Sequence, residues 1–288
     1  MSKQTNDSKK VSSFLSILDT WPSYFENWDE GLGTTYERVI LQHYFAELKK
    51  RYDVQPLLEA PSFGMTGISG INSLWWAAQG LTPTVVDDNE QRIAQSQQVW
   101  DSIPLPVKFV KRSLHEKLPF ADESFDLSWN FASLWFIKDV GQFAAELKRV
   151  TRKALFICVP NRKGVGYKLR YWLDKNLPEK FYPQNINPKA FVPHFTAGNW
   201  KIWRQGYLDI PPWPDIAMKK EDMLRKAGLG FLFKKKEAQK ERTCIVDYFN
   251  GSRPQLTADI LKYSFLEHAP FPVKQLWGHH RYFIFEKG

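Results

Sequence analysis

The feature that most constrains the fold is a regular alternation of strand-like and helix-like segments between residues 54 and 160. Short runs of β-branched and aromatic residues give way to stretches with helical periodicity. We expect strands at 54–60, 82–86, 107–110, 125–129 and 154–159, and helices at 71–79, 90–100 and 140–151. Parallel strands need crossover connections, so this alternation predicts an α/β, doubly wound, mostly parallel sheet with helices on both faces.

The segments before and just after this core have different patterns. Apolar residues at three- and four-residue intervals predict a helix over 34–51, so residues 1–53 are expected to form an N-terminal helical cap on a core at 54–161. Residues 162–218 contain many Pro, Trp and Tyr and little periodicity. Long irregular segments in compact domains are usually functional, so we expect a lid or substrate-binding insertion there.

The C-terminal part, 219–288, is expected to complete the same sheet. A helix is predicted at 219–227, and late strands at 231–236 and 281–286. The segment 243–275 between these strands has no clear pattern and is read as an insertion.

Composition narrows the class of protein. The 288 residues carry a formal charge of +9, which permits an anionic partner without requiring one. With two cysteines, Cys158 and Cys244, no disulfide framework is expected, which favours a reducing compartment. The polar N-terminus has no signal-peptide core, and no run approaches the roughly 18 apolar residues of a membrane span. We therefore expect a cytoplasmic protein without a transmembrane segment.

A glycine-rich turn between two acidic residues is the segment that most directly indicates a ligand site. The first predicted strand ends at Glu59, the glycines Gly64, Gly67 and Gly70 precede the next helix, and Asp87 ends the second strand. Glycines let backbone amides approach a ligand at a helix N-terminus. An acidic residue about 20 positions after the glycines suits the hydroxyls of a ribose. The pattern predicts a nucleoside site at the carboxyl edge of the sheet.

The spacing of the glycines limits the class of nucleoside ligand that the site can bind. A dinucleotide site requires Gly-x-Gly-x-x-Gly, whereas here two residues separate each pair of glycines. Glu59 is unsuited to the neighbourhood of a pyrophosphate but suits a cationic amino-acid group. S-adenosylmethionine joins an adenosine to such a group, so it is the cofactor that we expect.

Three further segments resemble a known family. The run Leu118-Pro-Phe-Ala-Asp-Glu-Ser-Phe-Asp-Leu127 is similar to the segment that enters the fourth strand of class I S-adenosylmethionine-dependent methyltransferases. Glu146-Leu-Lys-Arg-Val150 and Val159-Pro-Asn161 resemble the helix before the fifth strand and the end of that strand. The resemblance covers about 54–161 and points to the group that methylates small molecules, quinones and lipids. It implies a seven-stranded Rossmann-like sheet.

The resemblance also implies roles for individual residues. Glu59 would hold the methionine amino group, and Asp87, with Asp88 as its competitor, would hold the ribose. Asn130 and Phe131 would line the cofactor tail and the methyl group, and Leu114 or His115 would contact adenine.

Two departures from the family pattern bear on these roles. Pro61 and Phe63 stand where the family has glycines, and the segment 112–116 lacks the family's usual Asp beside adenine.

Methyl transfer to an oxygen or a protonated nitrogen also needs a base. Candidates in the C-terminal half are His194, Tyr207, Asp209, His279 and His280. We take His194, Tyr207 and His279 as catalytic candidates. Substrate-binding candidates are Tyr36, Arg38, Trp200, Trp203 and His280. Each also has a plain structural interpretation as a core, helix-face or edge-strand residue.

These observations predict S-adenosylmethionine-dependent methyl transfer to a small, apolar or amphipathic acceptor molecule. Two alternatives stay open: an RNA or other polyanion as the acceptor, suggested by the charge, and a non-catalytic binding protein on the same fold, suggested by Pro61 and Phe63. No metal is expected, because His279 and His280 lack further ligands at metal-site spacing. A homo-oligomer also stays open.

Overall fold

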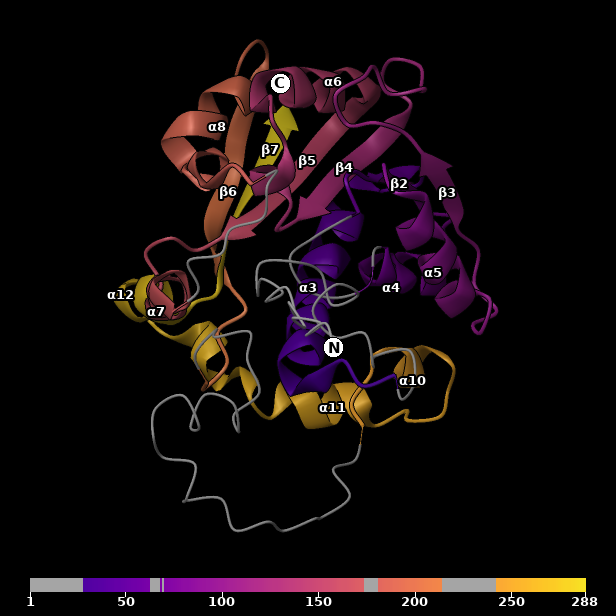
Figure 1. The fold of residues 1–288 in the computed structure, drawn as a ribbon, viewed down its shortest axis with the longest axis vertical. Helices are drawn as coiled ribbons and strands as arrows, with labels where there is room; N and C mark the ends of the chain where they lie inside the picture. The colour runs from indigo at the N-terminus through magenta and orange to yellow at the C-terminus, as the bar shows by residue number, and fades with distance from the viewer. Residues whose placement is uncertain (1–27, 63–67, 69, 174–180, 214–241) are drawn as a thin grey trace, which may run out of the picture.

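The computed structural model describes residues 28–62, 68, 70–173, 181–213 and 242–288, and within them a seven-stranded sheet forms the centre (Figure 1). The strands are β1 (Leu57–Glu59), β2 (Thr84–Asp87), β3 (Lys108–Lys111), β4 (Phe125–Phe131), β5 (Thr151–Pro160), β6 (Trp200–Leu208) and β7 (His280–Lys287). Their order is β3-β2-β1-β4-β5-β7-β6. The strands β1 to β5 are parallel, and β7 is antiparallel to both β5 and β6. The predicted α/β, doubly wound, mostly parallel sheet is confirmed.

Of the described helices, the first precedes β1 and the others lie between strands that follow one another in the chain. The longer ones are α3 (Gly31–Tyr52), α5 (Glu90–Trp100), α6 (Val140–Val150), α7 (Val165–Leu173) and α8 (Pro188–Phe195). The shorter ones are α4 (Leu74–Ala78), α10 (Val246–Phe249), α11 (Leu256–Leu261) and α12 (Phe271–Trp277). Single 3-10 turns are η1 (Ile71–Ser73), η2 (Leu134–Phe136), η3 (Pro183–Ile186) and η5 (Ser264–His268). The start of α6 is fixed by Asp139, whose side chain accepts from the backbone N–H of Gln142.

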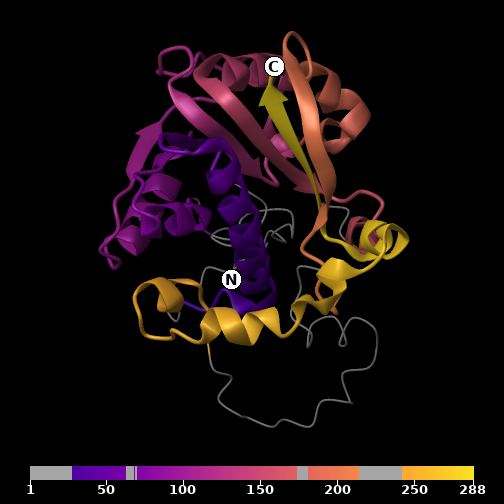
Figure 2. The same cartoon turned by 180° about the vertical axis from the view of Figure 1, so that it is seen from behind.

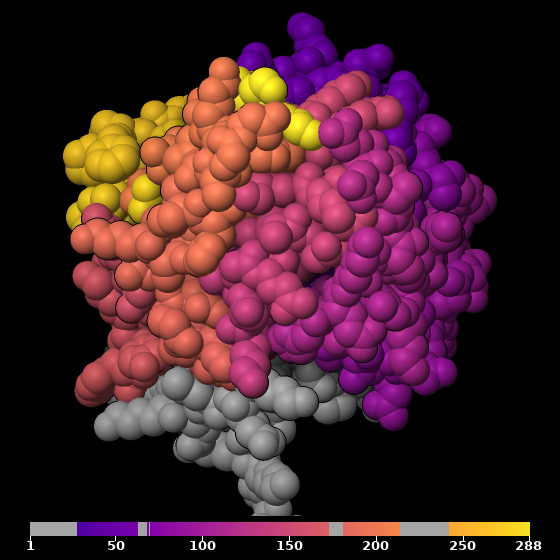
Figure 3. Space-filling view, turned by 90° about the horizontal axis from the view of Figure 1, so that it is seen from above, coloured from indigo at the N-terminus to yellow at the C-terminus, as the bar shows by residue number. Residues whose placement is uncertain are grey.

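The two faces of the sheet carry different helices. Successive side chains of a strand point to opposite faces. On β7, Phe283 packs on Phe191 of α8, with ring centroids 5.1 Å apart, whereas the neighbouring Tyr282 packs on Tyr44 of α3 at 4.8 Å. Helices α3 and α8 therefore cover opposite faces of the sheet (Figure 2). Helix α6 lies beside α8, and both are visible from above in Figure 3.

Helix α3 crosses its face of the sheet from the carboxyl edge to the amino edge. Near its start, Glu37 lies beside His280, the first residue of β7, which pairs with Pro160 at the end of β5. At its end, Arg51 forms an ion pair with Glu286, which pairs with Ala154 near the start of β5. The first turns of α3 are thereby held at the edge where the parallel strands end.

The C-terminal half differs from expectation in one respect. Strand β6 lies inside the segment 162–218 that was expected as an insertion, so residues 200–208 belong to the sheet. A register shift between Ile202 and Arg204 interrupts the alternation by which such a strand is recognised. The helix expected at 219–227 and the strand expected at 231–236 lie outside the described residues. The patternless segment 243–275 contains short helices.

In the part of the chain that the structure describes, no helix combines the length and the apolar character needed to cross a bilayer.

Candidate functional site

Several candidate residues meet at one edge of the sheet. Glu59 ends β1, Asp87 ends β2, and Phe131 ends β4. The carboxyl ends of parallel strands lie at the same edge, which is where open α/β sheets bind ligands. Because β7 is antiparallel, its first residue, His280, reaches this edge too.

Glu59 is a buried carboxyl group with which no lysine or arginine of the described residues forms an ion pair. Its Oε2 accepts a hydrogen bond of 2.5 Å from the hydroxyl of Ser73, and the residue is 2% exposed. Burial raises the pKa of Glu59 to about 8, although the hydrogen bond from Ser73 and the charge of Arg38 act in the opposite direction. A positively charged ligand group at this carboxylate would be strongly favoured.

Asp87 is buried at the end of β2 and is held in place by several donors. Its carboxylate accepts from the hydroxyl of Ser62, from the backbone N–H of Asn89 and from the guanidinium of Arg92. The neighbouring Asp88 is about half exposed and shares Arg92. Of the two expected ribose ligands, Asp87 is therefore the buried one, at the carboxyl end of β2.

The end of the glycine turn is described at Gly70. Gly64 and Gly67 lie outside the described residues. Gly70 has a φ of +74°, and a Cβ at this position would lie 3.0 Å from Val85 and 3.2 Å from Phe109. Only glycine suits both the backbone angle and the close approach of strands β2 and β3.

Asn130 and Phe131 close the site at the end of β4. Asn130 is buried and donates to the carbonyl of Ala60 at 3.4 Å, whereas its Oδ1 meets no partner among the described residues. The ring of Phe131 lies 4.4 Å from that of His280. Phe131, which was expected to line the cofactor tail and the methyl group, thus contacts the first residue of β7.

Asp209 and His280 form a dyad where β6 ends and β7 begins, and His279 is a second partner of Asp209. Asp209 follows β6, and its Oδ2 lies 3.1 Å from Nδ1 of His279 and 3.0 Å from Nδ1 of His280. Burial alone would raise the pKa of Asp209, but the two histidines lower it to about 2, so it is ionised. Nε2 of His279 lies 3.2 Å from the carbonyl oxygen of Trp213. Both ring nitrogens of His279 thus face acceptor oxygens.

His280 has a partner on one ring nitrogen only. Its Nδ1 lies 3.0 Å from Oδ2 of Asp209. Its other ring nitrogen is Nε2. That atom is buried and, within the described residues, meets no hydrogen-bond partner.

Glu37 joins this pair from α3. Atoms of Glu37, Asp209 and His280 lie within 4.8 Å of one another, and all three residues are buried. Two carboxylates and an imidazole have the composition of a metal site. Here, however, the nitrogen of His280 that faces Asp209 is used in a hydrogen bond.

Other substrate candidates on α3 are engaged with neighbouring elements. Tyr36 donates from its hydroxyl to Glu267 at 3.0 Å. Arg38 is buried, forms an ion pair with Glu30 at 2.8 Å and donates to Asn72 at 2.6 Å. Arg38 thus joins α3 to η1, the turn that follows the glycines.

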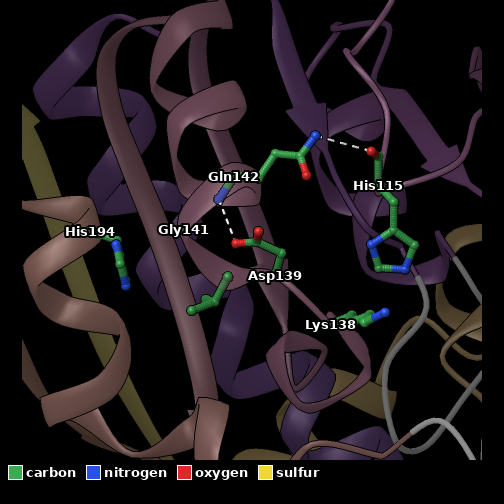
Figure 4. A pocket seen from close by; sticks show the side chains of 7 residues that line it. His115, Lys138, Asp139, Gly141, Gln142 and His194 are labelled. Atoms are coloured by element: carbon green, nitrogen blue, oxygen red, sulfur yellow. Dashed lines mark hydrogen bonds between the residues drawn. The ribbon is translucent and has the colours of Figure 1, made fainter.

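His194 and His115 lie apart from the dyad, around a hollow at the start of α6 (Figure 4). The hollow has a volume of about 690 Å³. In Figure 4, His194 lies on one side of Asp139 and His115 on the other, with the side chain of Gln142 bonded to the carbonyl of His115. His194 is exposed on α8, which covers the opposite face of the sheet from His280. Leu114 is partly buried in the turn before His115.

Tyr207, Trp200 and Trp203 lie along β6. The hydroxyl of Tyr207 accepts from Gln275 of α12 at 3.1 Å. Trp200 pairs with Lys287 at the amino edge, and Trp203 packs under the guanidinium of Arg51, 4.1 Å from its ring. The two tryptophans therefore lie away from the edge that holds Glu59, Asp87 and His280.

Some residues of the site have no motif in the sequence. Glu37 and Glu267 each contact the dyad region, from α3 and η5 respectively. Glu37 directly precedes Arg38 on a predicted helix, which gave a weak signal. Glu267 lies in the segment without a pattern. Ser73 and Arg92 donate hydrogen bonds to the carboxylates of Glu59 and Asp87, and no recognisable spacing in the sequence marks them.

The residues at this edge fit S-adenosylmethionine. The buried carboxyl of Glu59 matches an amino group, and Asp87, on the neighbouring strand, matches a ribose diol. Asp87 already accepts from Ser62, Asn89 and Arg92, so a bound ribose would compete with these donors for its about four lone-pair positions.

Comparison with known proteins agrees with this fit. Residues 64–158 match the family model of the methyltransferase domain. No curated protein matches the chain.

Solved structures share the fold. A putative sarcosine dimethylglycine methyltransferase from Galdieria sulphuraria aligns with a TM-score of 0.53 and 11% identity, over 86% of this chain and 85% of that one. The plantazolicin methyltransferase BamL, solved with S-adenosylhomocysteine, aligns with a TM-score of 0.53 and 10% identity, over 93% and 89% of the two chains. Residues 64–158 thus resemble a methyltransferase domain, and the chain shares the fold of these two solved structures.

Proposed function

We propose that this protein transfers a methyl group from S-adenosylmethionine to a small acceptor bound between the end of β4 and the start of β7. One observation carries the proposal: the Asp209–His280 pair lies beside Phe131, at the edge that also holds Glu59 and Asp87. The bound cofactor would supply a methyl group already activated on a sulfonium, so the chain's main tasks are alignment and exclusion of water.

The cofactor would be held by residues of three adjacent strands. Glu59 would bind the amino group, Asp87 the ribose hydroxyls, and Asn130 would offer its unpartnered Oδ1 at the end of β4. Leu114 and His115 remain the candidates for the adenine contact. Their position just after β3 supports this, because β3 neighbours β2 and therefore Asp87.

His280 would take the acceptor's proton. A hydroxyl acceptor must lose its proton as its oxygen bonds to the methyl carbon, whereas an ammonium acceptor must lose one before its nitrogen has a lone pair with which to attack. The buried, unpartnered Nε2 of His280 would accept it, while Asp209 would fix the orientation of the ring and stabilise the resulting imidazolium. His279, whose two ring nitrogens face Asp209 and the carbonyl of Trp213, would act as a positioning residue rather than as the base.

The first test is calorimetric titration of S-adenosylmethionine and S-adenosylhomocysteine into three proteins. Asp87→Asn should weaken binding at least about tenfold, because an amide cannot replace a charged acceptor of two hydroxyls. Asp88→Asn is the matched control, since it removes the same charge one residue away at an exposed position. Equal losses in both variants, or no binding by the folded wild type, would refute the cofactor assignment.

The second test addresses the base. His280→Gln should leave cofactor affinity within about twofold but lower the transfer rate to any identified acceptor by about 100-fold or more. The rate of the wild type should rise with pH through one ionisation that the variant lacks. His194→Gln, a histidine on the other side of the sheet, should retain the wild-type rate. A His280→Gln variant with the wild-type rate and pH profile would remove His280 from the mechanism.

A further inference from the structure

The exposed large apolar side chains of the described residues are confined to two segments. On and around α7 they are Val165, Leu169, Tyr171 and Trp172; around η5 and α12 they are Tyr263, Phe265, Phe271, Val273 and Leu276. Trp172 is 69% exposed, Phe271 64% and Phe265 62%. Scattered apolar residues on a surface need no explanation, but a concentration of this kind marks an interaction site. We call residues 162–172 and 263–277 together the α7–α12 surface.

The two segments form one surface. Helices α7 and α12 contact each other, and they lie together in both Figure 1 and Figure 2. Asn161, just before α7, donates from its Nδ2 to the carbonyl oxygens of Gln275 and Gly278 at 2.8 Å each. The end of α12 is thereby tied to the start of α7.

The charge on this surface is of one sign. Arg162, Lys163 and Lys168 are exposed on the α7 segment, which contains no acidic residue. The acidic residue of the second segment is Glu267, whose carboxylate accepts from Tyr36 and from the backbone N–H of Ile210. These two bonds hold the carboxylate, and the residue is only partly exposed.

We propose that the α7–α12 surface docks on an anionic lipid membrane. Aromatic and aliphatic side chains next to lysine and arginine suit the boundary between headgroups and acyl chains. Negatively charged lipids attract such basic residues by about 1 kcal/mol each near the surface. A second copy of this chain is a poorer occupant, because a two-fold contact would bring Arg162, Lys163 and Lys168 against their own equivalents without acidic partners.

The surface also adjoins the candidate acceptor site. Helix α12 ends at Trp277, three residues before His280, and Asn161 directly follows β5. Docking there would hold the carboxyl edge of the sheet close to the lipid. The proposal does not depend on the proposed methyl transfer, since it rests on exposure and charge alone.

The test is co-sedimentation of the full chain with vesicles. We expect weak binding to phosphatidylcholine alone and at least tenfold stronger binding when about 30% phosphatidylserine is included, with a decrease at high salt. The double variant Lys163→Glu and Lys168→Glu should reduce this binding by more than tenfold. The matched control, Lys50→Glu and Lys108→Glu, makes the same charge change at exposed positions elsewhere and should cost less than threefold.

A second double variant tests the contribution of the apolar side chains to vesicle binding. Trp172→Ser with Phe271→Ser should reduce binding to the anionic vesicles about tenfold or more, with an unchanged circular dichroism spectrum. Three outcomes would overturn the proposal: no binding to either vesicle, an equal loss in the control charge variant, or a concentration-dependent dimer that the serine variants abolish while vesicle binding is absent.

Discussion

At the scale of single residues, the buried carboxyl of Glu59 makes stability depend on pH. Its pKa is raised by burial from the ordinary value of 4.5 to about 8. Between these values the unfolded chain loses a proton that the folded protein keeps, so folding stability should fall as pH rises from about 5 to 8. We predict that Glu59→Gln removes most of this fall, by an amount on the order of a few kcal/mol. Urea unfolding at several pH values measures it.

The same carboxyl links cofactor binding to proton release. If Glu59 is protonated in the free protein at pH 7 and ionised beside the methionine ammonium, binding should release a proton from it. Calorimetry in two buffers with different ionisation enthalpies detects this release. In Glu59→Gln the release should disappear and affinity should fall. A variant that releases the same number of protons as the wild type would separate Glu59 from the cofactor.

At the scale of elements, Gly70 fixes the join between the glycine turn and η1. Gly70→Ala must place a Cβ at a φ of +74° and 3.0 Å from Val85. We expect a loss of about 1–3 kcal/mol in the free energy of unfolding and weaker cofactor binding, because the turn is displaced. Gly80→Ala is the control: its φ is +85° but its Cβ meets nothing within 4 Å. An equal loss in both variants would show that backbone strain alone matters, without the close contact to β2.

A buried ion pair between Arg38 and Glu30 holds the start of helix α3, and Arg38 also donates to Asn72 of η1. Arg38→Met would leave the carboxylate of Glu30 buried without its cation, which should cost about 3–5 kcal/mol in thermal or urea unfolding. Removing both charges, as in Arg38→Met with Glu30→Leu, should recover a large part of this loss. If the single variant is as stable as the wild type but no longer binds an acceptor, the sequence-based role of Arg38 in substrate binding would be favoured instead.

At the scale of the whole molecule, the sheet depends on its last strand. Strand β7 lies between β5 and β6, and its Phe283 and Phe285 are buried against α8. Removal of residues 279–288 therefore separates β6 and α8 from the core and should abolish the cooperative thermal transition. Lys287→Gln, which breaks an ion pair with the exposed Glu123, should cost less than about 1 kcal/mol. A truncated protein that unfolds at the wild-type temperature would contradict this view.

The sequence predicted the central elements well because their signals are local. The strand that ends at Glu59, the strand that ends at Asp87 and the helix at 90–100 each have their own apolar pattern or cap, such as Asn89 at the start of α5. Strand β6 was missed for the opposite reason: its residues alternate poorly, and it becomes a strand through pairing with β7, which is about 80 residues distant in the chain.

What the sequence determined by itself is the order of strands and helices along residues 54–160, the two acidic strand ends and the expected class of cofactor. Each of these follows from neighbouring residues and their spacing. Only the tertiary structure decided which distant groups meet. It brought Asp209, His280 and Glu37 together, and it separated His194 and Trp203 from them. It also joined α7 and α12 into one exposed surface. The physical reason is that contacts between remote segments depend on sheet pairing and helix packing, which no local pattern of residues records.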